Sequence, residues 1–228
     1  MQNFCVPPYF KKIAKGVFSM LNLGNLNNNN NGMGVSLDLR KGTSLDLTKK
    51  AKNLRRVRVG LGWQANENRA GVNYDLDASA ILLNARGMVN DNADVIFYNQ
   101  TNTNRGVYSD GDNLLGSYTQ NVDTDDETIH VELDKVPMMT NEIRFIVTIH
   151  DAFARQQNFG QVKNAYIRII DEDTNQELCR YRLNENFALQ ISCEIASLRR
   201  TPTGWEFVAL GNGSSKDLEG MLISYGVR

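Results

Sequence analysis

The chain has 228 residues, of which 41% are hydrophobic and 22% are charged, and its 25 basic side chains nearly balance 26 acidic ones. This ordinary globular composition allows one large all-β domain or two small domains, and the near-zero net charge argues against a dedicated polyanion binder, so we expect no nucleic acid partner. Three scattered cysteines, Cys5, Cys179 and Cys193, argue against a disulfide framework and favour buried free thiols in a cytoplasmic setting.

The first 32 residues differ from the rest of the chain. Residues 10–26 repeat apolar side chains at helical spacing beside three lysines, which predicts a short amphipathic helix. A basic amphipathic segment either lies peripherally on an anionic membrane or docks on a partner, and a weakly ordered extension is an equally good interpretation. Residues 27–32 form an asparagine-rich linker that cannot pack a core, so we place a domain boundary there and assign residues 33–228 to one domain.

After residue 33 the pattern becomes that of β-strands. Short β-branched and aromatic runs are separated by clusters of Gly, Asn and Asp, and no long helical period lies between them. This favours neighbouring antiparallel strands over parallel β-α-β units, and it predicts an all-β fold, an antiparallel β-sandwich. The predicted strands cover residues 35–39, 56–59 (leading into 60–63), 73–79, 95–98, 129–133, 143–149, 165–170, 177–183, 191–198 and 205–210.

Two basic clusters and two tryptophans stand out among these strands. The arginines of residues 55–58 and the pair Arg199–Arg200 lack the interleaved aromatic side chains that single-stranded nucleic acid binding uses. We interpret both clusters as charged edge strands, because charges at a sheet edge discourage unwanted pairing. We predict that Trp63 and Trp205 are core aromatics rather than part of a ligand site.

The stretch Asn73-Tyr-Asp-Leu-Asp-Ala-Ser79 is the first acidic feature with chemical meaning. On a strand, alternate residues share a face, so Asp75, Asp77 and Ser79 point one way while the apolar side chains between them point toward the core. Two carboxylates and a hydroxyl on one face offer hard oxygen ligands, which suit Ca²⁺ better than Zn²⁺. One strand cannot complete such a shell, so loops elsewhere must supply further oxygens.

The second acidic feature is denser. Between Ser109 and Asp134 the chain has eight carboxylates and no Lys or Arg. Like charges packed together repel, and a folded domain keeps them close only if something cationic compensates. A bound divalent cation is therefore our hypothesis for this patch, and a solvated acidic loop is the alternative. The eight residues are Asp110, Asp112, Asp123, Asp125, Asp126, Glu127, Glu132 and Asp134.

Several further stretches occur in a recognisable order along the chain. They are Gly34–Leu37, Val59–Trp63, Tyr74–Ser79, Phe97–Asn99, Gly111–Leu114, Asp125–Glu127, Val147–Ala152, Gln157–Val162 and Asn164–Ala165. With these stretches, residues 33–228 resemble the tellurium-resistance (TerD) family of calcium-binding stress proteins. The resemblance implies a β-sandwich whose acidic loops hold calcium, in a cytoplasmic, non-enzymatic protein linked to tellurite and other chemical stress.

The resemblance also implies a set of calcium ligands. The family's acidic motifs fall on seven residues, and Asn99 is an additional candidate. The expected ligands are Asp75, Asp77, Asn99, Asp112, Asn113, Asp125, Asp126 and Glu127. Two departures from the family pattern bear on the number of calcium sites. Asn73 stands where the family usually has an acid, and the stretch between Asn113 and Asp125 is longer than usual.

The function that fits these features is a calcium-stabilised interaction module. Its partners are unidentified proteins, for which related family members and membrane-associated stress proteins are candidates. One alternative is a small-molecule binding module of the cyclic-AMP type, and another is a metal-dependent hydrolase that uses the same carboxylates. His150 and Asp151 are adjacent in sequence, and because adjacent strand residues point to opposite faces we expect no direct pairing and no catalytic dyad.

Overall fold

The computed structural model describes residues 36–64, 74–111, 124–183, 187 and 189–228. The strands are β1 (Leu37–Leu39), β2 (Ser44–Asp46), β3 (Arg56–Gln64), β4 (Leu76–Leu83), β5 (Val95–Ile96), β6 (Val107–Ser109), β7 (Glu127–Glu132), β8 (Glu142–Ile149), β9 (Lys163–Asp171), β10 (Gln176–Arg182), β11 (Ser192–Thr201) and β12 (Gly204–Ser214). The helices are α1 (Leu47–Lys50), the 3-10 turn η1 (Asn92–Asp94), α2 (Ala152–Arg155) and α3 (Leu218–Ser224). The predicted N-terminal helix and linker lie outside the described residues, and so do Asn73, Asp112 and Asn113.

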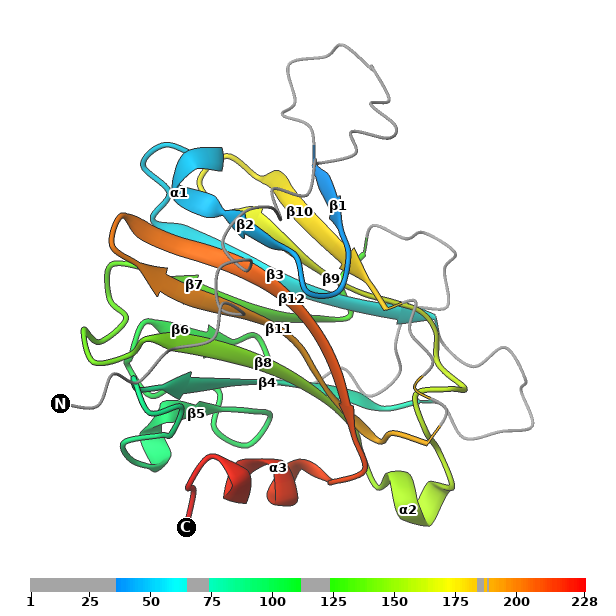
Figure 1. Ribbon diagram of the computed structural model, residues 1–228. Coiled ribbons are helices and arrows are strands. Elements are labelled where there is room, and N and C mark those ends of the chain that lie inside the picture. Colours follow the sequence, from blue (N-terminus) through cyan, green and yellow to red (C-terminus); the bar gives the residue numbers. More distant parts are fainter. Residues whose placement is uncertain (1–35, 65–73, 112–123, 184–186, 188) are drawn as a thin grey trace, which may run out of the picture. The chain divides into compact units, whose positions relative to one another are not determined.

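The strands form two six-stranded sheets that pack face to face (Figure 1). Sheet A has the order β1-β10-β9-β3-β7-β6, and sheet B has the order β2-β12-β11-β8-β4-β5. The predicted β-sandwich is therefore confirmed. The expectation of purely antiparallel pairing is wrong at one edge, because β1 pairs in parallel with β10, with Leu37 opposite Cys179. These two strands are far apart in sequence, so no hairpin fixes their relative direction.

One apolar core fills the space between the sheets. Alternate residues of each strand point inward, and the largest fully buried side chains are Tyr181, Phe145 and Phe207. Full burial of each such side chain stabilises the fold by about 1.5–3 kcal/mol. Cys179 and Cys193 are buried and form no disulfide among the described residues, and burial raises the pKa of the Cys179 thiol.

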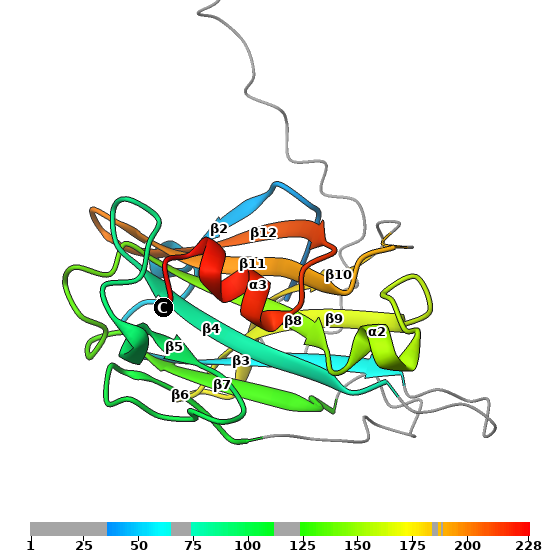
Figure 2. The same ribbon diagram turned by 90° about the horizontal axis from the view of Figure 1, so that it is seen from below.

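The helix α3 lies across the outer face of sheet B (Figure 2). Met221 and Tyr225 pack there against Ile81, Leu83 and Ile146. Because this part of sheet B is covered on both faces, the second half of β4 is an unbroken apolar run, whereas its first half alternates.

The basic clusters do not lie on edge strands. Arg56 belongs to β3, which lies between β9 and β7, while Arg199 and Arg200 belong to β11, between β12 and β8. The interpretation as charged edge strands is therefore wrong. Arg56 instead donates from Nε to Asp173 Oδ1 at 3.1 Å, across the outer face of sheet A.

Candidate metal site

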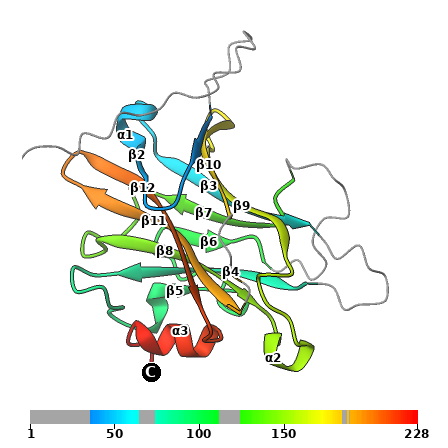
Figure 3. The same ribbon diagram turned by 45° about the vertical axis from the view of Figure 1, so that its right-hand side comes forward.

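Several strand ends meet at one end of the sandwich, where four predicted ligands lie. Here β4 begins opposite the end of β8, with Leu76 paired to Ile149, and β7 begins opposite β3, with Glu127 paired to Leu61. The short helix α2 follows β8 at this end (Figure 3). We call this region the acidic end and define it by Asp75, Asp77, Asp126 and Glu127.

Asp75 and Asp77 emerge where β4 is joined to β8. Asp75 directly precedes β4, and its carbonyl oxygen accepts a hydrogen bond from the His150 N–H at 2.8 Å. The two acids are only 5% and 4% exposed, respectively. The inward-facing neighbours of Asp77 pack against the core, so Asp77 and Ser79 share the outer face of β4, as the alternation predicted.

The Asp75 carboxylate is only partly compensated. Its Oδ2 atom lies 3.2 Å from Arg155 Nη1, which follows from the position of α2. Its Oδ1 atom is buried and has no hydrogen-bond partner among the described residues, and the same holds for the Ser79 hydroxyl. A buried polar atom without a partner costs roughly 1–3 kcal/mol, so this oxygen is a favourable position for a cation or a water molecule.

His150 lies between two acids at the end of β8. Its Nδ1 atom is 3.7 Å from Asp77 Oδ2, and its Nε2 atom is 3.5 Å from Asp151 Oδ2. We expected no direct pairing of His150 with Asp151 on the ground that strand neighbours point to opposite faces, but the two side chains lie near each other because strand alternation ends at Ile149. Asp151 has a left-handed backbone with φ 49°, and this turn places its side chain beside the imidazole. Both distances are too long for strong hydrogen bonds.

Sheet A contributes Glu127 and Asp126 to the acidic end. Glu127 is buried, and its Oε2 atom accepts a hydrogen bond from the backbone N–H of Ala78 on β4. Asp126 Oδ2 accepts a hydrogen bond from the Trp63 N–H at 2.9 Å, which holds the segment against β3. A carboxylate of sheet A thus reaches the strand of sheet B that carries Asp77.

Asp125 has a different environment from its two neighbours. Its carboxylate lies over Gly60 on the outer face of sheet A, and a Cβ atom at Gly60 would collide with it. Arg168 donates from Nε to Asp125 Oδ1 at 2.7 Å and from Nη2 to Oδ2 at 3.0 Å. The cation that compensates this predicted ligand is therefore an arginine of β9.

Asn99 lies in an exposed turn that follows β5. The adjacent Tyr98 packs edge-on against the His150 ring, with 6.3 Å between ring centroids, so the turn borders the acidic end. Within the described ranges, no three His, Cys, Asp or Glu side chains converge closely enough to hold a metal ion. The described carboxylates can thus provide only part of a shell, and Asp112 and Asn113 lie outside the described residues.

Sequence reasoning missed the two arginines that hold these acids. Arg155 and Arg168 are remote in sequence from Asp75 and Asp125, and only the pairing of β8 with β4 and of β9 with β3 brings them close. A signal was present only for Arg168, which lies in the predicted strand 165–170, whereas Arg155 lies in α2, beyond the predicted strand 143–149. Only the strand order, which the sequence pattern does not specify, shows which acid each arginine approaches.

The comparisons with known proteins agree with this architecture. Residues 33–225 match the family model of the TerD domain. The chain belongs to the TerD family. It is 43% identical over 195 residues to general stress protein 16U of Bacillus subtilis (strain 168), covering 85% of this chain and 99% of that protein. It is 40% identical over 194 residues to the tellurium resistance protein TerD of Serratia marcescens, covering 85% of this chain and 98% of that one.

A solved structure shows the same fold for the TerD domain. The crystal structure of a homologue of telluride resistance protein (TerD) from Streptomyces coelicolor A3(2) aligns with a TM-score of 0.53, at 20% identity, over 73% of this chain and 94% of that one. The chain is thus a TerD-family protein of the stress-response and tellurium-resistance group. Among the helices that the structure describes, none has both the length and the apolar character needed to cross a bilayer.

Proposed function

We propose that this TerD-family protein binds calcium at the acidic end, and that the bound ion fixes a surface on which partner proteins dock. The observation that carries the proposal is Asp75 Oδ1, a buried carboxylate oxygen without a hydrogen-bond partner among the described residues. An ion at this oxygen would remove the cost of burying it unpaired. The available donors are oxygens, which Ca²⁺ prefers.

The charge at the acidic end supports the same proposal. Asp75, Asp77 and Glu127 are all buried carboxylates at the same end of the sandwich. A divalent cation would stabilise carboxylates that are buried in one region. We therefore propose Asp75, Asp77 and Glu127 as ligands that a bound ion would draw together, since they do not converge in the structure without it, with Asp112 and Asn113 added from the family resemblance.

The remaining described residues among the predicted ligands are not proposed as direct calcium ligands. Asp125 is held by Arg168, so we leave it out of the proposed ligand set. Asp126 accepts the Trp63 N–H and Asn99 lies in the bordering turn, so we propose them for the outer shell.

We propose a binding role rather than catalysis for this site. His150 is the histidine nearest to the acids, and it lies 3.7 Å from Asp77 and 3.5 Å from Asp151. The surrounding groups are carboxylate oxygens held by the Ala78 N–H and by Arg155, and such oxygens suit the binding of a hard cation. We also propose a reducing, cytoplasmic setting, because the buried Cys179 and Cys193 form no disulfide among the described residues.

Thermal unfolding in calcium and in the chelator EGTA tests the metal proposal. A ligand at one hundred times its Kd stabilises the folded state by about 2.7 kcal/mol, which for a domain of this size raises the midpoint by roughly 5–10 °C. Asp75→Asn and Asp77→Asn should lose this rise. Glu132→Gln is the matched control, because Glu132 pairs with Lys135 at 2.7 Å at the other end of β7 and should leave the rise intact. Equal wild-type midpoints in calcium and EGTA would reject the proposal.

Two further measurements separate the parts of the proposal. Isothermal calorimetry gives the number of calcium ions per chain and shows whether Asn73 has removed a site. Affinity capture in calcium and in EGTA tests the docking role. Asp77→Asn in calcium should capture the same proteins as the wild type in EGTA, and an unchanged set of captured proteins would limit calcium to a stabilising role.

A further inference from the structure

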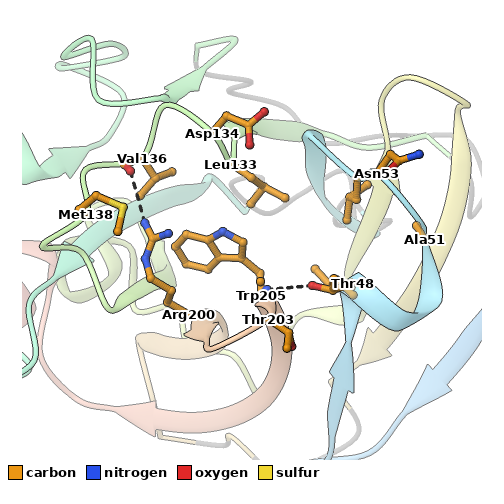
Figure 4. A pocket seen from close by; sticks show the side chains of 13 residues that line it. Thr48, Ala51, Asn53, Leu133, Asp134, Val136, Met138, Arg200, Thr203 and Trp205 are labelled. Carbon is orange, nitrogen blue, oxygen red and sulfur yellow. Dashed lines mark hydrogen bonds between the residues drawn. The ribbon is translucent and has the colours of Figure 1, made fainter.

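A cavity lies at the opposite end of the sandwich from the acidic residues. The strand β7 leads from Glu127 at the acidic end to Glu132, and the cavity lies beyond it, between the α1 segment and the β11–β12 turn. Its volume is about 490 Å³, within the range of small-molecule sites. Figure 4 shows Trp205 at its centre, with Arg200 on one side and Thr48, Ala51 and Asn53 on the other. We call this cavity the Trp205 pocket.

The lining of the Trp205 pocket combines an apolar body with a few polar groups. Leu54, Leu133 and Val136 are apolar, and Trp205 is 5% exposed. The prediction that Trp205 is a core aromatic is confirmed by this burial, yet the residue also forms a wall of the pocket. Such a lining suits a flat organic ligand with one polar group.

Arg200 is fixed in the pocket by neutral acceptors. Its Nε atom donates to the Thr140 carbonyl at 3.0 Å, and Nη2 donates to the carbonyls of Val136 at 3.3 Å and Pro137 at 3.2 Å. The guanidinium carbon lies 4.3 Å from the Trp205 ring centroid. Three carbonyls and one indole face therefore hold the cation in a single orientation before any ligand arrives.

The charge of Arg200 has no acidic partner in the described part of the chain. No carboxylate lies within 4 Å of it there, and its second terminal nitrogen, Nη1, has no hydrogen-bond partner among the same residues. Neighbouring Arg199, by contrast, lies 3.5 Å from Glu142. Burial lowers the pKa of the Arg200 guanidinium. A fixed cation that lacks a carboxylate is complementary to an anionic group of a ligand.

We propose that the Trp205 pocket binds a small planar organic anion with a single carboxylate or similar group. The anionic group accepts hydrogen bonds from Arg200 Nη1, and the flat apolar body lies along Trp205 and Leu133. Asp134, an exposed residue of the lining, opposes further negative charge on the ligand. This site is separate from the acidic end and does not depend on calcium.

A purely structural role for Arg200 makes different predictions. Its three carbonyl contacts could serve only to hold the turn between β7 and β8. In that case substitution would lower stability, but the pocket would show no preference for an anion over a neutral compound of the same shape. Charge discrimination is therefore the decisive property.

The test uses 2-naphthoate as the probe and its neutral analogue 2-naphthamide as the control. Binding to the full chain is followed by the indole N–H resonance of Trp205, which a Trp205→Phe spectrum assigns, and by calorimetry. We expect saturable naphthoate binding with Kd near or below about 1 mM. The amide should bind about tenfold more weakly, because a charge-assisted hydrogen bond is lost. Calcium and EGTA should give the same values.

Two variants complete the test. Arg200→Met should remove the preference for naphthoate over naphthamide, provided that its folded-state spectrum is retained. Asp134→Asn changes an exposed residue, so we expect the fold to be retained. It should tighten naphthoate binding severalfold. Equal affinity for the two probes in the wild type would overturn the proposal. So would the absence of saturable binding, or weaker naphthoate binding by Asp134→Asn.

Discussion

Arg168 binds both oxygens of Asp125, with Nε 2.7 Å from Oδ1 and Nη2 3.0 Å from Oδ2. Both side chains are largely buried, at 11% and 8% exposure. Breaking a buried ion pair by removing one charge is costly, but here Glu177 also lies 3.1 Å from Arg168 and retains part of the compensation. The Arg168–Asp125 ion pair thus stabilises the outer face of sheet A.

Asp125→Asn should therefore lower the free energy of unfolding by about 2 kcal/mol, measured by urea denaturation in EGTA. The calcium-induced rise of the thermal midpoint should remain, because Arg168 already neutralises this carboxylate. If the variant instead kept its stability and lost the calcium response, Asp125 would be a metal ligand, as the family resemblance implied.

Gly60 lies directly beneath the Asp125 carboxylate. Gly60→Ala places a methyl group where the Asp125 side chain lies, so we expect a loss of about 1–3 kcal/mol in unfolding free energy. The double change of Gly60→Ala with Asp125→Gly makes room for the methyl group, and it should be less harmful than the sum of the two single changes. Strict additivity in the four urea curves would show that Gly60 matters for another reason.

Glu127→Gln separates hydrogen bonding from charge at the acidic end. The amide oxygen can still accept the Ala78 N–H, so stability in EGTA should fall by less than about 1 kcal/mol. Calcium affinity should fall about tenfold or more, because a carboxylate ligand becomes neutral. Calorimetry and chemical denaturation measure the two quantities independently. An unchanged calcium affinity would remove Glu127 from the proposed ligand set.

Glu177 should contribute to stability at neutral pH and lose that contribution in acid. Burial alone would raise its pKa, but hydrogen bonds from Arg180 and Ser36 outweigh this and hold the pKa below the ordinary value of 4.5. Because the folded-state pKa is depressed, the stabilisation is fully present above about pH 4.5 and is lost as pH falls through the folded value. The free energy of unfolding, measured by urea denaturation, should therefore fall less steeply with decreasing pH in Glu177→Gln than in the wild type. Equal slopes for the two proteins would contradict the prediction.

The sandwich was predictable from the sequence because its long strands are strongly patterned. The predicted segments 143–149 and 165–170 fall within β8 and β9. The strands β2 and β6, of three residues each, were missed, whereas β1 of the same length was predicted as part of the longer alternating run 35–39. The helix α3 was missed as well, although Leu218, Met221, Leu222 and Tyr225 are at helical spacing and Met221 and Tyr225 pack on sheet B.

The residues of the acidic site were predictable from the sequence, but the different environments of neighbouring acids were not. The sequence pattern correctly placed Asp77 and Ser79 on one face of β4. It could not distinguish Asp125, which faces Arg168, from Glu127, which faces Ala78, because the segment between them turns before β7 begins. It also treated Asp151 as a strand residue, whereas a left-handed turn places its side chain beside His150.

The contact between Glu127 and Ala78 has a consequence for how separate molecules behave. In the described structure, β5 pairs with only Ala80 and Ile81 of β4, so the first residues of β4 have no strand beside them on that side. An exposed strand edge of this kind is a site at which a strand of another molecule pairs and amyloid-like stacking begins. The buried carboxylate already occupies the donor that such a chain would use, and it would meet an incoming backbone carbonyl with like charge. We therefore expect Glu127 to disfavour the addition of another chain at this strand edge.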